Sequence, residues 1–221
     1  MSPRPVFEQE LKILKNQVAE MCDRAQISYD RLLLAINTND RDALEQLLDN
    51  DRHMTDMQRG IEAKCLTLLT KQQPVARDLR LVTSALKVVT DIERIGDHVT
   101  DIAELCLRTE ASPAVAYGGE CMKNMMSEAK KMLIEAVEAF TSSDMTTAKA
   151  VINKDDDVDR LFNQVKDSMM QAIRERSLDA DVVVDTLMLA KYLEKIGDHA
   201  VNIAEWAIFM LTGDIQGVKL Y

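Results

Sequence analysis

The sequence predicts an all-α protein made of two tandem three-helix bundles, with six long helices in total. The main observation is an internal repeat: residues 93–104, ERIGDHVTDIAE, return as EKIGDHAVNIAE at 194–205, and eight of the twelve positions are identical. A near-copy 101 residues further along indicates a duplication in which each half ends in one copy. In addition, 4% aromatic residues, 7 Gly and 4 Pro in 221 residues disfavour a sandwich or barrel.

The helices follow from apolar residues spaced by three and four, and from the breaks between such segments. The first helix is expected to begin near Phe7, after two prolines. The turn at 37–40 closes on Asp40, a typical helix N-cap, and a matching turn at 141–144 lies 104 residues later. Pro74 ends the second helix, because proline disfavours helix immediately before it. The expected helices span about 7–37, 40–71, 75–108, 120–141, 144–176 and 179–211.

The duplication divides the chain into residues 1–112 and 113–221. Between the two repeats, residues 109–120 collect one proline and two glycines, which is the composition of a linker. The repeat offset falls from 104 to 101 because the second half lacks three residues around 72–74.

Each copy of the repeated motif carries an acidic stripe beside its apolar seam. Carboxylates four residues apart lie about 5–6 Å apart on one helix face and repel each other. We therefore expect compensation, either by cationic side chains from neighbouring helices or by bound metal ions, which as hard cations prefer oxygen ligands. Gly96 and Gly197 interrupt these helices, and the missing side chain would let a neighbouring helix or a ligand approach closely. The stripes comprise Glu93, Asp97, Asp101 and Glu104, and Glu194, Asp198, Asn202 and Glu205.

The middle helix of each half supplies further carboxylates. With the offset of 104, Asp51 aligns with Asp155, and Thr55 with Asp159. The acidic run at 155–159 also has a plain reading as a solvated helix face, where negative charge near the N-terminus is favourable. Asp155 and Asp159, four residues apart and opposite the repeated motif, remain candidate ligands.

Composition and charge exclude several classes of function. A net charge of −10 argues against nucleic-acid binding and is compatible with binding cations. The four cysteines are widely spaced, as expected for reduced packing residues. No signal peptide or membrane-spanning stretch is visible, so we expect a cytoplasmic protein. No nucleophile–base pair, nucleotide motif or glycine-rich phosphate loop is visible, so no catalytic or cofactor-binding residue is predicted.

The repeated ExIGD–HxxxIAE motif, preceded in the first half by QQPVARDLRLV at 72–82, resembles the PhoU family over essentially the whole chain. The resemblance implies two similar three-helix bundles, commonly as a homodimer, and a regulatory rather than catalytic activity. Members restrain phosphate uptake and the phosphate-starvation response. They act between the ATPase subunit of a phosphate ABC transporter and a sensor histidine kinase, so such a protein would reach the membrane only through these partners.

The resemblance also implies multinuclear metal clusters bound through the acidic motifs, with Fe, Mn, Mg, Ca or Zn as candidate ions. Each half lacks one carboxylate that the other half has: Thr55 stands where the second half has Asp159, and Asn202 stands where the first has Asp101. The two sites should therefore differ in metal affinity or in the number of ions they bind. Glu104 and Glu205 lie on the same faces but are not assigned. Carried over by position, the ligands would be Asp51, Glu93, Asp97 and Asp101 in the first half, and Asp155, Asp159, Glu194 and Asp198 in the second.

Two further features have a plain and a functional reading. His98 and His199 lie about 100° around the helix from the preceding aspartate, so they are either surface residues or residues that orient a carboxylate. Arg77, Asp78 and Arg80 form either a charge network in the first turn of a helix or a surface for a partner, absent from the second half.

Two other classes of protein remain as alternatives. One is a structural helical adaptor whose carboxylates are neutralised by lysine or arginine without metal. The other is a carboxylate-bridged di-iron oxidase, which normally uses ExxH pairs on facing helices. Here the motif glutamates are five residues from His98 and His199, so that pattern is missing.

Overall fold

The computed structural model describes residues 3–108, 118–215 and 218–219, and within them every side chain except those of residues 3–4, 49–51, 215 and 218–219. The all-α prediction is confirmed. A short antiparallel hairpin of β1 (Asp214–Ile215) and β2 (Val218–Lys219), which the sequence analysis did not predict, follows the last helix. The helices are α1 (Pro3–Thr38), α2 (Arg41–Gln72), α3 (Ala76–Arg108), α5 (Gly119–Ser142), α6 (Met145–Glu175) and α7 (Ala180–Thr212).

The helix ends have local causes, most of which the sequence predicted. Asp40 is the N-cap of α2, since its side chain accepts a hydrogen bond of 3.0 Å from the amide of Ala43. Asp144 caps α6 in the same way, with a 2.8 Å bond from the amide of Thr146. The expected start of the first helix near Phe7 was wrong. Helix α1 already begins at Pro3, because proline fits the first turn of a helix.

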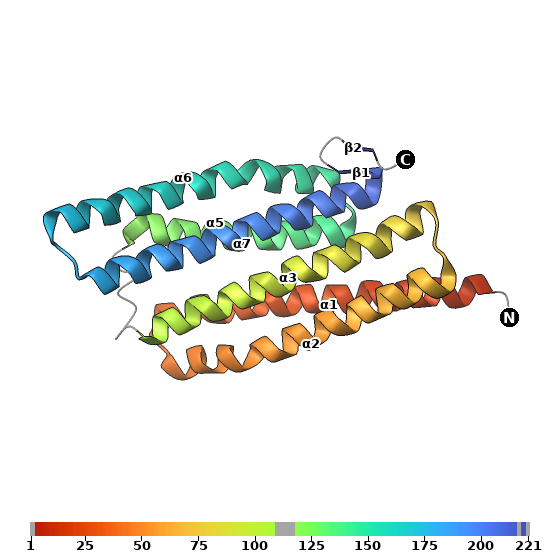
Figure 1. Ribbon diagram of the computed structural model, residues 1–221, viewed down its shortest axis with the longest axis horizontal. Helices are drawn as coiled ribbons and strands as arrows, with labels where there is room; N and C mark the ends of the chain where they lie inside the picture. Colours follow the sequence, from red (N-terminus) through yellow and green to blue (C-terminus); the bar gives the residue numbers. More distant parts are fainter. Residues whose placement is uncertain (1–2, 109–117, 216–217, 220–221) are drawn as a thin grey trace.

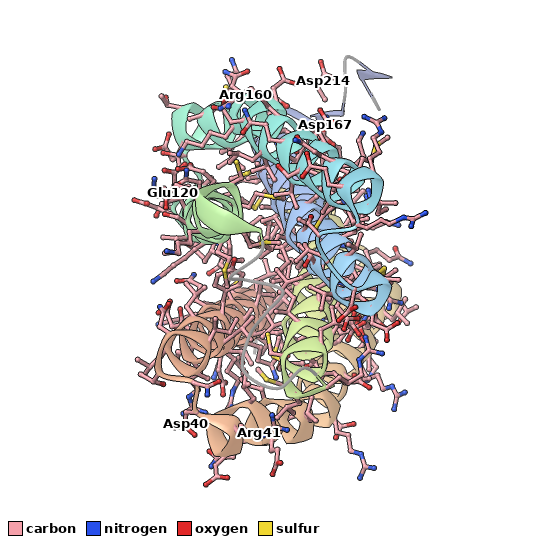
Figure 2. The ribbon with its side chains drawn as sticks, turned by 90° about the vertical axis from the view of Figure 1, so that its left-hand side faces the viewer. Asp40, Arg41, Glu120, Arg160, Asp167 and Asp214 are labelled. Carbon is pink, nitrogen blue, oxygen red and sulfur yellow. The ribbon has the colours of Figure 1, made fainter. Side chains whose placement is uncertain are left out.

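The six helices form two three-helix units that lie side by side (Figure 1). Helices α1, α2 and α3 make one unit, and α5, α6 and α7 make the other. The units meet where α3 packs along α7 and α1 packs against α5, so these four helices form the centre and α2 and α6 lie outside. Seen along the helices, the side chains fill the space between the units, whereas Arg160 and Asp167 of α6 point outward (Figure 2). One apolar core therefore runs through both units.

Specific contacts fix how the two units meet. The buried hydroxyl of Tyr29 in α1 donates a 2.9 Å hydrogen bond to the carbonyl of Met126 in α5. At one end of α3, Arg80 Nε donates a 3.2 Å bond to the carbonyl of Met210 in α7. At the other end, Arg108 lies 3.0 Å from Asp185 near the start of α7. Helices α3 and α7 are therefore antiparallel along most of their length.

Several predictions concern the linker, the thiols and the membrane. The boundary between residues 112 and 113, and most of the expected linker, lie outside the described residues. All four cysteines are free thiols, as expected, and burial raises the pKa of Cys22 to about 12 and of Cys106 to about 11.

In the described part of the chain, no helix combines the length and apolarity needed to cross a bilayer.

The hydrogen bond between Tyr29 and Met126 should contribute measurably to stability. We expect Tyr29→Phe to lower the free energy of unfolding by about 1–2 kcal/mol, because a buried bond between the two units is lost while the ring is kept. Tyr192→Phe is the matched control, since the Tyr192 hydroxyl forms no hydrogen bond within the described residues. Urea unfolding followed by circular dichroism measures both; equal effects would mean that the bond contributes nothing.

Candidate functional site

The two acidic motifs lie near the middle of α3 and α7, each facing the outer helix of its own unit. The expected close approach at the two glycines is not found, because a methyl group added at either would make only ordinary van der Waals contact with the outer helix. A methyl group added at Gly96 would lie 3.6 Å from Met54 of α2, and one added at Gly197 would lie 3.6 Å from Val158 of α6. Met54 and Val158 are themselves 104 residues apart. The same helix contact is therefore built twice, in the register that the sequence predicted.

The structure gathers the carboxylates of the second half at the contact of α6 with α7. The pKa of Asp155 is raised, first by burial and then by the negative charges of Asp198, Asp159, Asp156 and Glu194. The other three carboxylates predicted for this half are thus close enough to act on Asp155. The arrangement stores electrostatic repulsion, which a bound cation would relieve.

The first half has a version of the same arrangement in which threonine replaces one aspartate. Thr55 of α2 lies 3.5 Å from Glu93, which is 8% exposed, so these residues occupy the places that Asp159 and Glu194 have in the second half. Asp51 lies on α2, but its side chain is outside the described part of the chain. Thr55 therefore stands beside Glu93 where the second half has a carboxylate.

Cations from the same helix pair with the first motif. The guanidinium of Arg94 lies 2.9 Å from Asp97 and 3.6 Å from Glu93. Compensating cations were expected on neighbouring helices, so Arg94 was not predicted. Its signal was the spacing of three residues between Arg94 and Asp97, which places the two side chains on one face of the helix.

The second motif has equivalent partners. Lys195, which aligns with Arg94, contacts Asp198 and lies 3.4 Å from Glu194. Lys191 lies 2.7 Å from Glu194. The hydrogen bond to Asp198 is the main reason why the pKa of Lys195 is raised. Both motifs are thus neutralised in part by residues of their own helices.

These ion pairs decide how well the residues fit a metal ion. Among the described residues, no three Asp, Glu, His or Cys side chains converge to hold an ion as they stand. The donors are nevertheless the oxygen ligands that hard cations prefer. The side chains of Arg94 and Lys195 are 57% and 38% exposed, and exposed ion pairs contribute only about 0–1 kcal/mol. The residues present thus have the chemistry of a hard-cation site, while their carboxylates pair with these two exposed side chains.

The two motif histidines lie in the interface between the repeats. Nδ1 of His98 lies 3.3 Å from Asp101, so Asp101 is held beside α7 while Asp97 pairs with Arg94. Nδ1 of His199 lies 2.9 Å from Asp91, whose carboxylate also accepts a 3.0 Å bond from Asn202. His98 thus orients a predicted ligand, whereas His199 joins the two repeats through Asp91.

The interface has approximate two-fold symmetry, with the two histidine rings at its centre. His98 and His199 stack with their centroids 5.6 Å apart, and His98 also stacks on Tyr192 at 5.5 Å. With the offset of 101, Tyr192 occupies the position equivalent to Asp91, and His199 the position equivalent to His98. The pairs Asp91–His199 and Tyr192–His98 are therefore equivalent contacts. The role of Asp91 was not predicted, although this alignment was the available signal.

The segment that was a candidate partner surface lies at the start of α3, far from both motifs. Arg80 is half-buried and engaged with the carbonyl of Met210, so it joins the two units. Arg77 is exposed and Asp78 half-buried, and both line a cavity at this end of the molecule. Of the three residues, Arg80 has a clear structural task.

The fold and motifs define a class: an all-helical protein of two tandem three-helix repeats, each with an acidic motif facing its outer helix. The family model described as PhoU domain matches twice, at residues 18–106 and 122–207. The chain therefore belongs to the PhoU domain family.

Relatives and solved structures agree with this membership. The chain is 32% identical to the "Phosphate-specific transport system accessory protein PhoU homolog" of Clostridium acetobutylicum, covering 95% of this chain and 96% of the relative. It is 34% identical to the protein of the same name from Aquifex aeolicus, covering 93% of each. The crystal structure of PhoU from Pseudomonas aeruginosa superposes with a TM-score of 0.85 at 28% identity, over 94% of this chain and 100% of that one. For the fold alone, the PhoU structure from Streptococcus pneumoniae gives a TM-score of 0.84 at 23% identity, over 96% of this chain and 100% of that one.

The repulsion around Asp155 predicts a stabilising substitution. Because its pKa is raised, the charged form opposes folding above the ordinary pKa of an aspartate. Asp155→Asn should therefore raise the free energy of unfolding of metal-free protein at pH 7, by a few tenths to about 1 kcal/mol. The gain should shrink as the pH falls and the aspartate becomes protonated in both states. Asp167→Asn, an exposed position on the same helix, is the control for urea unfolding in chelator; a loss of stability in Asp155→Asn would contradict the arrangement.

The carboxylate of Asp91 should be important for the interface between the repeats. Asp91→Ala leaves His199 and Asn202 without their shared acceptor, which should lower the free energy of unfolding by about 1–3 kcal/mol. Glu104→Ala removes the same charge from an exposed position on the same helix and should change it little. Thermal unfolding of the two variants provides the comparison, and equal melting temperatures would show that the contact is dispensable.

Proposed function

We propose that this protein is a cytoplasmic regulator of phosphate-specific transport. It acts as an adaptor between the ATPase subunit of the phosphate ABC transporter and a sensor histidine kinase, and restrains phosphate uptake and the starvation response. The observation that carries the proposal is the match to phosphate-specific transport accessory proteins over 95% of the chain at 32% identity. The protein is not an enzyme in this proposal, and it functions as a homodimer.

The second part of the proposal is that the acidic motifs bind metal ions as multinuclear clusters. Its support is the gathering of Asp155, Asp159, Glu194 and Asp198 at one helix contact, beside a cation that can turn into solvent. The first site is built from Glu93, Asp97, Asp101 and Asp51. Each site has four carboxylates, but Thr55 takes the place of one aspartate in the first half and Asn202 takes the place of another in the second, so the two sites differ in affinity or nuclearity. Fe, Mn, Mg, Ca and Zn are the candidate ions.

A second candidate is a metal-free adaptor, and it also rests on a specific observation. Arg94 and Lys195 already neutralise part of each motif, as that alternative requires. The two candidates differ in what metal does to stability. A ligand that binds only the folded protein raises its stability by about 2.7 kcal/mol at a hundredfold excess over Kd, whereas a metal-free adaptor shows no change.

The direct test is the metal content of protein purified without chelator, measured by elemental mass spectrometry. Asp97→Ala and Asp198→Ala should each lower the number of bound ions, whereas Asp167→Ala, which changes the same charge on an exposed face, should not. If the protein binds no metal even after anaerobic loading with iron or manganese, the acidic motifs are structural and the metal-free candidate holds.

Asp155→Asn separates the two candidates in a single variant. It is expected to stabilise the metal-free protein but to lose most of the rise in melting temperature that metal gives the unmodified protein. For a chain of this size a gain of about 2.7 kcal/mol corresponds to roughly 5–10 °C. Equal rises in the two proteins would mean that metal binds elsewhere.

The adaptor role needs its own measurement. Immobilised protein should bind the purified ATPase subunit and the cytoplasmic part of the kinase in biolayer interferometry, with and without chelator. Size-exclusion chromatography with light scattering gives the oligomeric state of the same preparation. Failure to bind either partner would overturn the adaptor role and leave metal binding to be judged separately.

A further inference from the structure

Two adjoining cavities of about 330 and 220 Å³ open at the end of the molecule where the repeats meet. Both are lined by Lys15 of α1, Leu81 of α3, Ser143 between α5 and α6, and Met210 of α7. The larger has the size of a pocket for a small ligand, which is about 300–1,000 Å³. Along α3, Arg77 and Leu81 lie about 24 and 18 Å from Glu93 of the first acidic motif, and Ala85 of the smaller cavity lies about 12 Å from it, since each helical residue advances 1.5 Å. The cavities are therefore separate from the candidate metal sites.

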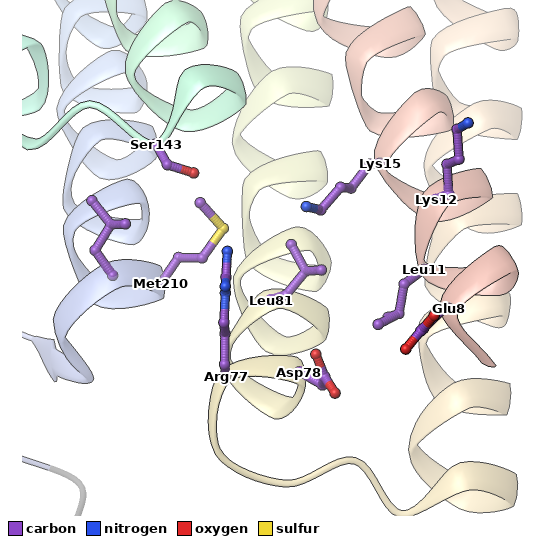
Figure 3. A pocket seen from close by; sticks show the side chains of 10 residues that line it. Glu8, Leu11, Lys12, Lys15, Arg77, Asp78, Leu81, Ser143 and Met210 are labelled. Atoms are coloured by element: carbon purple, nitrogen blue, oxygen red, sulfur yellow. The ribbon is translucent and has the colours of Figure 1, made fainter. Parts of the chain in front are cut away.

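The mouth of the larger cavity presents two cations and a hydroxyl. Lys15, Arg77 and Ser143 come from three different elements and point into the same space (Figure 3). Within the described part of the chain, no ion pair or hydrogen bond engages the side chain of Lys15 or of Arg77. Two cations directed into one space repel each other unless an anion lies between them.

The charge around the cavity differs in sign from that of the whole protein. Three cations line it, Lys12 being the third, together with the carboxylates of Glu8 and Asp78, so its formal charge is 3 − 2 = +1. The chain as a whole carries −10. In Figure 3, Glu8 and Asp78 lie on the side away from Ser143. The side formed by Lys15, Arg77 and Ser143 therefore suits an anion.

Beyond this polar mouth, the smaller cavity has an apolar floor. Leu14, Val18, Ala85 and Phe140 line it together with Met210, and all five belong to the core. Contact with such a floor stabilises an apolar group by about 25 cal/mol for each Å² removed from water. A simple inorganic anion would leave this part of the cavity unused.

The cationic mouth occurs in only one repeat. The offsets of 104 and 101 place Gly119 and Leu178 at the positions equivalent to Lys15 and Arg77. Arg77 also belongs to the segment 72–82, whose motif the second half lacks. The second repeat therefore lacks the two cations that form this mouth.

We propose that this end of the molecule binds a small amphiphilic anion, a carboxylate or phosphate monoester with one short apolar chain or ring. Lys15, Arg77 and Ser143 hold the charged group, and the apolar part lies on the floor near Phe140 and Met210. The site touches α1 and α3 of one repeat, and α7 and the α5–α6 turn of the other. Its ligand therefore bridges the two repeats, independently of the proposed regulatory function and of metal.

Octyl phosphate and octanoate are suitable probes, since they carry the two candidate head groups on the same chain. Protein labelled with ¹³C at its methionine methyl groups is titrated with each probe below its micelle concentration, and Met210→Leu assigns the Met210 signal. We expect a saturable shift of that signal with at least one probe. Octanol and inorganic phosphate, which each keep one half of the ligand, should bind at least about tenfold more weakly.

The double variant Lys15→Gln/Arg77→Gln should raise Kd for the better probe at least about tenfold, because it removes both charge-assisted contacts. Lys149→Gln/Arg174→Gln removes the same charge from exposed positions outside the cavity and should leave Kd within about twofold. Melting curves of both variants show whether they remain folded; both replace exposed side chains, so we expect unchanged melting temperatures.

Three results would overturn the proposal. One is the absence of a saturable Met210 shift with either probe. Another is an equal Kd for the two double variants, since binding would then be independent of the cationic mouth. The third is inorganic phosphate that binds as tightly as octyl phosphate, because the apolar floor would then contribute nothing.

Discussion

The packing of α3 along α7 is the contact on which the rest of the structure depends. These two helices carry both acidic motifs, so their alignment fixes where each motif faces its outer helix. The contact is held at both ends by arginines, through Arg80 and Arg108, and at the centre by the bonds of His199 and Asn202 to Asp91. Because one apolar core runs through both units, the two motifs are held within a single packed structure.

The two motifs show why acidic stripes need not signal metal by themselves. Each stripe finds a cation three residues away on its own helix, through Arg94 and Lys195. Such pairs are weak and exposed, so they neutralise charge without fixing the carboxylates in place. The carboxylates of both stripes are thus partly neutralised within their own helices.

Much of the fold could be predicted from the sequence because its causes are local or periodic. Asp40 marks a helix start through its own side chain, and the repeat offset relates the contact of Met54 with Gly96 to that of Val158 with Gly197. The interface between the repeats could not be predicted in this way. Apolar periodicity shows which face of α3 is buried, but not which helix covers it, so the role of Asp91 became visible only in three dimensions.

The mismatch of Asp91 and Tyr192 bears on the origin of the molecule. In a dimer of identical three-helix chains, both sides of the histidine pair would be obliged to carry the same residue. Here one side uses a carboxylate that accepts hydrogen bonds, and the other an aromatic ring that stacks. Joining the two copies in one polypeptide freed each half to mutate alone. The two halves of a symmetric ancestor could thus diverge in sequence, and their surfaces could come to recognise different molecules.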